Sequence, residues 1–434
     1  MPEASLDKLV PEQDFAGLLA MKARALLRLA AAPPDAAWTK RRYFEISYEA
    51  DLVEGFLDDY GARRNRTYSA FTELVACTRG FSLAGLSLEH LSRRILGYGV
   101  VDRLPALERR AALADIDAAH RFVRERLEAL QGALLEEATG LGVTSLQPGA
   151  GQAPADEEVR RFKLPQNLGH DRSGSNEQRI AEIATKFLEA AQRLDELGLR
   201  TFLDAEARER FLQERYREEH ARVMEANVHN LQSAYDTYVK NTVYESTNER
   251  LPRLRGHISA TLHLLEAATQ LTHFVERHER GLRSDLVDRR VQALVSRVEV
   301  RQVTAERLLV WARLYMAAGR AIAEQVVPAY TRSGELAVDL AADVYLHARP
   351  SALIVGVVAH HGTPVQMLIG DQVCNAASIL ELMVAVGANA EARRVIFRGD
   401  ERPLADLRRL FEAGCGERGL DALPLELSYL RRGG

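Results

Sequence analysis

Apolar residues recur three and four positions apart over most of the chain up to about residue 330. This spacing places them along one face of an α-helix and predicts a series of amphipathic helices. In residues 1–139 the pattern predicts a first helix, one or two more, and then a long one. Their expected ends and breaks lie at proline or glycine: Pro33-Pro34, Gly61, Gly80 and Gly140.

The composition changes between residues 140 and 176, where Gly, Pro, Ser, Asn and Asp dominate. Such residues favour turns and irregular chain and offer little apolar surface to bury. A connection of this length is unusual inside a compact domain. The sequence therefore predicts a flexible, partly disordered linker over 140–176.

Helical spacing returns at residue 177 and continues to about residue 330. It predicts a helix between Asn176 and Gly198, one long charged helix from about Asp204 to about Asn248, and another that Pro252 opens. Helices this long bury their apolar faces against one another, either in a bundle or between two copies of the chain. We expect residues 177–330 to form a long-helix bundle and consider a homodimer through these helices.

Beyond Pro328 several short runs alternate apolar and polar residues, which is typical of strands. Short helical runs lie between them. The expected order is strand, helix, strand, strand, helix, strand, helix. This order predicts a small α+β domain over residues 333–413, with its helices on one face of a sheet. Residues 414–434 form an extension whose alternating "LELSYL" would add an edge strand or bind the helical part.

The bulk composition agrees with a multidomain fold. The chain has 434 residues, of which 47% are apolar and 27% charged, with a net charge of −4. This length allows two or three domains. The expected fold class is mainly a helical bundle to about residue 330, followed by the small α+β domain.

Charge and cysteine content bear on the compartment and the partners. The near-neutral net charge gives no reason to expect nucleic acid or an anionic membrane as a partner. The longest apolar runs are far shorter than the roughly 20 residues that span a bilayer, and the first residues lack a secretory pattern. Three widely spaced cysteines form neither a zinc motif nor a disulfide framework. We expect a cytoplasmic protein.

The stretch "VYLHARPSALIVGVV", residues 344–358, combines groups that suit phosphate chemistry. Pro350 marks a helix start, because proline is favoured in the first turn, and His347 and Arg349 come just before it. A helix start presents unpaired N–H groups and the positive end of the helix dipole, which attract phosphate. Arg349 adds guanidinium donors, and a neutral His347 imidazole can attack a phosphoryl group. The same residues also fit an exposed histidine in a turn.

Residues Glu335–Glu412 resemble HPr, the histidine-containing phosphocarrier of the bacterial phosphotransferase system. "LHARPSA", Leu346–Ala352, is similar to the active-site loop of that family, and "NAASILELM", Asn375–Met383, is similar to its regulatory-serine segment. The expected order of strands and helices also agrees. The resemblance implies an open-faced sandwich, with His347 as the phosphoacceptor and Arg349 in contact with the phosphate. It also implies an Enzyme I-type protein as the phosphoryl donor.

Further implications of the resemblance concern the second helix of this domain. Ser378 matches a serine that is phosphorylated in some relatives, although a serine at this place can simply cap a helix. Ile379 and Leu380 match apolar positions that contact partner proteins in the family. The protein that would receive the phosphoryl group, or be controlled by it, is not indicated.

Two clusters in the helical region have competing interpretations. The first contains His257, His263, Glu266, His273, Glu276 and His278. These residues would be metal ligands, a second phosphohistidine site, or ordinary polar residues of an amphipathic helix. The last interpretation is favoured, because the Glu-x-x-His pairs of di-iron bundles are missing. The second cluster, Tyr60–Glu73, mixes arginine with aromatic residues and would bind an anion or RNA, but its acidic neighbours favour a charged bundle surface.

The leading hypothesis is a cytoplasmic phosphocarrier or phosphorelay regulator that is not an enzyme in the strict sense. It would accept a phosphoryl group on His347 and pass it on, or use it to control a partner bound by the helical region. No cofactor or metal is expected, and the chain has no Walker motif. The main alternative is a non-catalytic adaptor that uses the HPr-like fold as a docking surface. A third is a catalytic or metal-binding helical region switched by the carrier domain.

Overall fold

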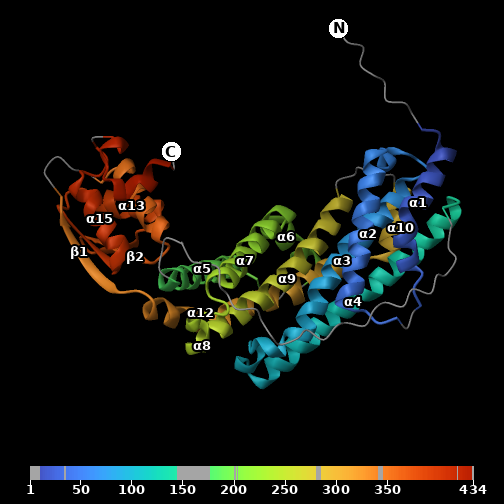
Figure 1. Cartoon of the computed structure of the whole chain (residues 1–434), viewed down its shortest axis with the longest axis horizontal. Helices are drawn as coiled ribbons and strands as arrows, with labels where there is room; N and C mark the ends of the chain where they lie inside the picture. Colours follow the sequence, from blue (N-terminus) through green and yellow to red (C-terminus); the bar gives the residue numbers. More distant parts are fainter. Residues whose placement is uncertain are drawn as a thin grey trace, which may run out of the picture. The chain divides into compact units, whose positions relative to one another are not determined.

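The computed structural model describes residues 10–33, 36–143, 176–199, 202, 204–279, 285–340, 346–417 and 419–432. The described chain is mostly helical and has one four-stranded antiparallel sheet near its C-terminal end (Figure 1). Most of the predicted linker, residues 144–175, lies outside the described part of the chain. None of the described helices is both long and apolar enough to cross a bilayer.

Two compact units make up the chain, and each combines three separate segments. Unit 1 contains Met1–Asp171, Leu197–Ala226 and Ser259–Tyr315, and unit 2 contains Arg172–Glu196, Asn227–Ile258 and Met316–Gly434. The helices α7, α9 and α12, defined below, contribute residues to both units. The domain boundaries expected from composition remain predictions.

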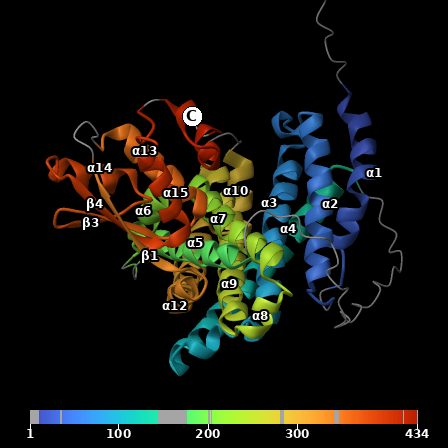
Figure 2. The ribbon, with the colours of Figure 1, turned by 60° about the vertical axis from the view of Figure 1, so that its left-hand side comes forward.

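The first four long helices belong to unit 1 and are α1 (Glu12–Ala30), α2 (Lys40–Asp59), α3 (Ser69–Arg94) and α4 (Ala106–Gly140). Short 3₁₀ turns join them: η1 (Ala62–Arg64), η2 (Leu96–Tyr98) and η3 (Val101–Arg103). The helices lie side by side in both views (Figures 1 and 2). The Thr39 hydroxyl caps α2 by accepting from the Arg42 amide. Gly61, with φ of 67°, follows the end of α2, as predicted.

The predicted break at Gly80 is wrong, because α3 continues through it to Arg94. A glycine inside a helix costs only about 1 kcal/mol, and the buried neighbours Cys77 and Phe81 hold the helix in the core of unit 1. Gly85 in the same helix has a packing role instead. A Cβ atom there would lie 2.2 Å from the Tyr43 ring, so only glycine lets α2 and α3 approach this closely.

In the described part of the chain, nine further helical segments precede the sheet. They are α5 (Asn176–Glu196), α6 (Ala205–Arg215), α7 (Glu218–Tyr238), α8 (Val243–Thr247), α9 (Arg250–Glu279), α10 (Asp285–Leu294), α11 (Arg297–Gln302), the π-helix η4 (Val303–Leu308) and α12 (Leu309–Ala329). The single helix predicted over 204–248 is therefore wrong. The fully buried Tyr216 leaves the helical conformation, with φ of −139° and ψ of 59°, and separates α6 from α7. Asn241 has φ of 63° and precedes the Thr242 cap of α8.

The order of elements expected beyond residue 328 is confirmed. It runs β1 (Ser333–Asp339), α13 (Ala348–His361), β2 (Val365–Ile369), β3 (Gln372–Asn375), α14 (Ile379–Ala388), β4 (Arg394–Asp400) and α15 (Glu401–Glu412). The sheet order is β1-β4-β2-β3, with every neighbouring pair antiparallel. Phe397 of β4 lies opposite Leu336 on one side and Met367 on the other, and the three form the centre of the covered face.

The helices cover one face of this sheet, as the alternation predicted. Ile354 of α13, Leu382 of α14 and Leu407 of α15 pack into the same core as the inward side chains of the strands. The opposite face carries polar and apolar side chains: Arg398 is exposed and pairs with its cross-strand neighbour Glu335 at 2.8 Å, and Ile396 lies between Ala337 and Leu368. The sheet therefore has one buried and one open face.

The C-terminal extension does not add an edge strand, so that expectation is wrong. It forms two 3₁₀ helices, η5 (Leu420–Ala422) and η6 (Leu425–Arg432), and η6 packs on α13 and α15. Leu423 and Leu427 are four residues apart and both enter the core of the α+β domain. Gly356 of α13 leaves room for Leu430, whose Cδ2 atom would lie 2.7 Å from a Cβ atom at that glycine.

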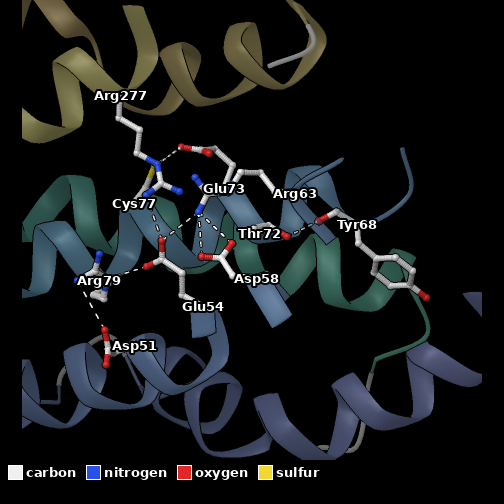
Figure 3. Close-up of polar contacts among 10 residues, drawn as sticks. All are labelled: Asp51, Glu54, Asp58, Arg63, Tyr68, Thr72, Glu73, Cys77, Arg79 and Arg277. Carbon is white, nitrogen blue, oxygen red and sulfur yellow. Dashed lines mark hydrogen bonds and ion pairs between the residues drawn. The ribbon is translucent and has the colours of Figure 1, made fainter. Parts of the chain in front are cut away.

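A buried charge network joins α2, α3 and α9 within unit 1 (Figure 3). Arg277 of α9 lies 3.0 Å from the carboxylate of Glu54 and 3.5 Å from that of Glu73. Arg79 also contacts Glu54, at 2.7 Å. Burial opposes the charged form of Glu54, but Arg79 and Arg277 outweigh it and hold the pKa of Glu54 below its ordinary value. The network thus ties α9 to the N-terminal helices.

The arginine and aromatic stretch Tyr60–Glu73 contributes to the same region. Arg63 pairs with Asp58 at 3.0 Å and lies 3.6 Å from Glu54. The hydroxyl of Tyr68 donates to the backbone carbonyl of Glu12 at 2.7 Å. These groups have partners inside the helical unit, which favours the charged-surface interpretation over anion or RNA binding.

We predict that Arg277→Met lowers the free energy of unfolding by about 3–5 kcal/mol, because it leaves two buried carboxylates without their shared cation. The Glu73 side chain is 2% exposed and that of Glu54 9%, so water cannot replace the guanidinium. Urea denaturation followed by circular dichroism measures the change. Arg253→Met is the matched control, since the Arg253 side chain is 43% exposed and its ion pair among the described residues is with the exposed Glu249. Equal losses in the two variants would contradict the prediction.

Candidate functional site

His347 lies at the start of α13, where it takes the place of the usual capping residue. Its Nδ1 atom accepts a hydrogen bond from the backbone N–H of Arg349 at 3.4 Å, and about half of its side chain, 51%, is exposed. The helix begins at Ala348, so Arg349 and Pro350 belong to its first turn. The expectation that Arg349 comes before the helix is corrected accordingly. The imidazole therefore faces the open amide end of α13 and also solvent.

The other ring nitrogen of His347 has a carboxylate partner. Nε2 lies 2.7 Å from Oε1 of Glu417, whose side chain is 40% exposed. Because an N–H group donates to Nδ1, the ring proton belongs on Nε2, which donates it to Glu417. The lone pair of the neutral ring is then on Nδ1. The two hydrogen bonds together select one tautomer and one orientation of the ring.

Glu417 reaches this position through a tight left-handed loop after α15. Gly414, Cys415 and Gly416 have φ angles of 74°, 53° and 74°. The Cys415 amide bonds back to the Leu410 carbonyl at 2.9 Å, as in the usual helix-ending motif. A Cβ atom at Gly416 would lie 2.6 Å from Leu353 of α13. Glycine at 416 therefore provides both the backbone angle and the close approach to α13.

Sequence reasoning missed Glu417, because it assigned residues 414–434 to an extension beyond the domain. The available signal was the "GCGERG" run directly after the last predicted helix, since closely spaced glycines mark a sharp turn. Cys415 in this run is buried, and burial together with Glu417 raises the pKa of its thiol to about 12. The thiol stays protonated at neutral pH and is a poor nucleophile.

Few protein groups bind the polar donors in the first turn of α13. Arg349 is exposed, and its guanidinium has no ion pair within the described residues. Pro350 has no N–H group, and the Ser351 amide already donates to the His347 carbonyl at 3.1 Å. The remaining amides of this helix start are those of Ala348 and of Arg349, which donates to Nδ1 of His347. An anion beside the imidazole would meet these amides and the guanidinium.

Ser378 caps α14, and the two residues after it are exposed. The Ser378 hydroxyl accepts from the Glu381 amide at 3.3 Å, while the Glu381 carboxylate accepts from the Asn375 amide at 3.0 Å. The exposed fractions of Ile379 and Leu380 are 44% and 72%. We use the name apolar patch for the exposed aliphatic residues of α14, which are Ile379, Leu380, Met383 and Val384.

The histidine and glutamate cluster of α9 does not converge on one point. His263 pairs with Glu266 at 2.8 Å, whereas His273 pairs with Glu218 of α7 at 2.9 Å. His257 is buried, Glu276 accepts from the Glu218 amide, and the side chain of His278 lies outside the described residues. Among the described residues no group of three or more His, Cys, Asp or Glu is arranged to hold a metal ion.

Comparison of the chain with models of protein families, with curated proteins and with solved structures found no match in any of the three. The arrangement of the site therefore has to be interpreted from its own residues.

The C-terminal extension that carries Glu417 is held down by a second polar contact. Asp406 of α15 accepts from Nε2 of His361 at 2.9 Å and from the Tyr429 hydroxyl at 2.8 Å, and it also binds Arg409. Burial alone would raise the pKa of Asp406, but these three hydrogen bonds together hold it below its ordinary value. His360 stacks on Tyr429 with a ring separation of 3.6 Å. The charged carboxylate thus connects α13, α15 and η6.

We predict that Asp406→Asn destabilises the α+β domain by about 1–3 kcal/mol at pH 7, since hydrogen bonds to a charged acceptor are lost. A lowered pKa means that the stabilisation is present above the ordinary pKa of 3.8 and is lost as pH falls through the lower folded value. The difference between wild type and variant should therefore shrink below about pH 4. Denaturation curves at pH 7, 5 and 3 measure it. Asp339→Asn, at a side chain that is 83% exposed, should show little difference at any pH.

Proposed function

We propose that this chain is a phosphocarrier or phosphorelay regulator of HPr type, and that its C-terminal domain accepts a phosphoryl group on Nδ1 of His347. One observation carries the proposal: a half-exposed imidazole at the start of α13 has its Nδ1 lone pair at the helix amides and its Nε2 proton on Glu417. This arrangement presents an unprotonated nucleophile where a phosphate would be stabilised.

The proposed transfer balances without an added acid or base. The Nδ1 lone pair forms the new nitrogen–phosphorus bond, while the bond between phosphorus and the donor breaks and its electron pair leaves with the donor. No proton has to leave Nδ1, because the ring proton is on Nε2 and stays with Glu417. Once Nδ1 is bonded to phosphorus, the Arg349 amide loses its acceptor and can donate to a phosphoryl oxygen. The guanidinium of Arg349 adds positive charge for the same oxygens.

The fold supports the resemblance to HPr that the motifs suggested. The order of strands and helices, the single covered face and the antiparallel sheet are those expected of an open-faced sandwich. In this proposal an Enzyme I-type protein is the donor, as the resemblance to HPr implies. The half-exposed His347 side chain is one that protein donors and acceptors can reach. The apolar patch would provide docking contacts, with Leu380 as its most exposed member.

Regulation at Ser378 also belongs to the proposal. A phosphate at the start of α14 would be favoured by the helix dipole. It would also lie beside the carboxylate of Glu381. The backbone amide of Glu381 now donates to the Ser378 hydroxyl. A phosphate there would therefore disturb the present cap and add negative charge beside the apolar patch. The helical region would dock or sense the partner that the phosphorylation state controls.

We predict that the purified chain becomes labelled when it is incubated with radioactive phosphoenolpyruvate and the Enzyme I of the same organism. The label should be acid-labile and alkali-stable, as expected of a phosphoramidate, and His347→Ala should abolish it. His220→Ala is the control, because His220 is an exposed histidine of α7 and should leave labelling unchanged. Label that persists in His347→Ala would place the acceptor elsewhere.

We predict that Glu417→Ala slows the labelling of His347 by about tenfold, because removal of a group that orients a reactive histidine commonly costs at least that much. Glu417→Gln should restore most of the rate, since its side-chain oxygen can still accept from Nε2. Imidazole ¹⁵N chemical shifts provide an independent measurement. Wild type should show the proton on Nε2 alone, and Glu417→Ala should show a mixture of tautomers. A normal rate in Glu417→Ala would contradict the positioning role.

The apolar patch also favours a second candidate function, that of a docking module without phosphoryl transfer. Leu380 and Val384 are 72% and 62% exposed on the same helix, and contiguous exposed apolar side chains are a feature of docking surfaces. In this alternative, partner binding depends on Leu380 and not on His347. Both functions predict that Leu380→Asp weakens a pull-down of the partner, so the labelling assay separates them. The phosphocarrier predicts acid-labile label on wild type that His347→Ala abolishes, whereas the docking module predicts no label on either.

A further inference from the structure

A cavity of about 390 Å³ lies in the helical part of unit 1, away from the residues used so far. Its lining comes from the junction of α6 and α7, from α9, and from the α11–η4 segment. The lining residues are Leu212, Gln213, Tyr216, Arg217, Thr272, Val275, Glu276, Arg301 and Thr304. Gln213 and Arg217 are exposed, whereas Tyr216, Thr272 and Thr304 are buried. The cavity therefore has a polar mouth and a buried interior.

Thr272 is a buried helical threonine whose hydroxyl lacks a hydrogen-bond partner, as is Thr78 of α3. The Thr272 side chain is buried, with 8% of the residue exposed, and Oγ1 has no partner. A helical threonine normally donates to the carbonyl four residues earlier. Thr269 and Thr304 do so, each at 2.9 Å. Thr272 lines the cavity with a hydroxyl that no protein group satisfies, and leaving such a group without a partner costs about 1–3 kcal/mol.

The other polar groups of the cavity are mainly donors. Arg217 at the mouth has no ion pair within the described residues. Arg301 is mostly buried, with 11% of its side chain exposed, and lies 3.3 Å from Glu209. The lining carboxylate, Glu276, accepts the first amide of α7 from Glu218. Burial raises the pKa of Tyr216, so its phenol also stays a neutral donor.

Two of the three parts of the lining, the junction of α6 and α7 and the α11–η4 segment, are places where regular α-helix is interrupted. Tyr216 and Arg217 form the break between α6 and α7, and Thr304 belongs to the π-helix η4. A π-helix is rare in proteins and is found frequently at functional sites. Leu212 and Val275 complete the lining with apolar surface. The cavity therefore combines a donor-rich polar part with an apolar wall.

We propose that this cavity binds a small organic anion, whose carboxylate or phosphate group is held by Arg217, Arg301 and the Thr272 hydroxyl. Unpaired donors and positive charge call for an acceptor with negative charge. The apolar wall of Leu212 and Val275 accommodates the carbon skeleton of the ligand, and the volume suits a small metabolite. The proposal does not depend on phosphoryl transfer at His347.

Isothermal titration calorimetry on the full chain tests whether the cavity binds an organic anion. The three probes are pyruvate, glycerol 3-phosphate and inorganic phosphate. At least one organic probe should bind with one-to-one stoichiometry and more tightly than inorganic phosphate. Pyruvate and glycerol 3-phosphate separate recognition of a carboxylate from recognition of a phosphate. Arg217→Gln and Thr272→Val should each weaken this binding by about tenfold, the equivalent of about 1.4 kcal/mol.

Two control variants make the result specific. Arg210→Gln removes an exposed arginine of α6 that pairs with Glu206 outside the cavity, and it should leave binding unchanged. Thr269→Val removes a satisfied hydroxyl and should lower the melting temperature, whereas Thr272→Val removes an unsatisfied one and should not. The proposal is overturned if neither organic probe binds, or if Arg210→Gln weakens binding as much as Arg217→Gln does.

Discussion

The hydrogen bond from the Arg349 amide to Nδ1 of His347 is the interaction on which the proposed chemistry depends. Helix starts are usually capped by a hydroxyl or carboxylate oxygen, which is a poor nucleophile in this setting. Here the cap is a nitrogen with a lone pair, and the same helix start that holds it would stabilise the group it attacks. The capping position and the reactive position are thus one residue.

That arrangement needs a second contact, because a single hydrogen bond leaves an imidazole free to turn. Glu417 provides it from the C-terminal extension, and the left-handed run Gly414–Gly416 brings the carboxylate back over α13. Asp406 then joins α13, α15 and η6 through His361 and Tyr429. The extension is therefore part of the domain that carries the site, and its stability bears directly on the orientation of His347.

The helices of unit 1 are held together by different interactions. These helices are held by apolar stripes and by the buried network of Arg277, Glu54 and Glu73, whose charges are compensated inside the protein. The cavity lined by Thr272 departs from this pattern, since a buried hydroxyl there has no partner. Other buried hydroxyls of this unit, such as that of Thr78, also lack a partner, but the Thr272 hydroxyl lines a cavity that an acceptor can enter.

The strands and helices of the α+β domain could be predicted from the spacing of apolar residues. Runs with strand and helix spacing alternate clearly beyond residue 328, and Pro350 marks a helix start. The sequence by itself determined the order of these elements and that a helix starts close to Pro350. Only the tertiary structure decided that Tyr216 interrupts a helix and that Gly80 does not, because burial of side chains against other helices outweighs local propensity. It also decided that Glu417 meets His347, seventy residues away along the chain, since such a contact depends on how the extension folds back and leaves no periodic trace in the sequence.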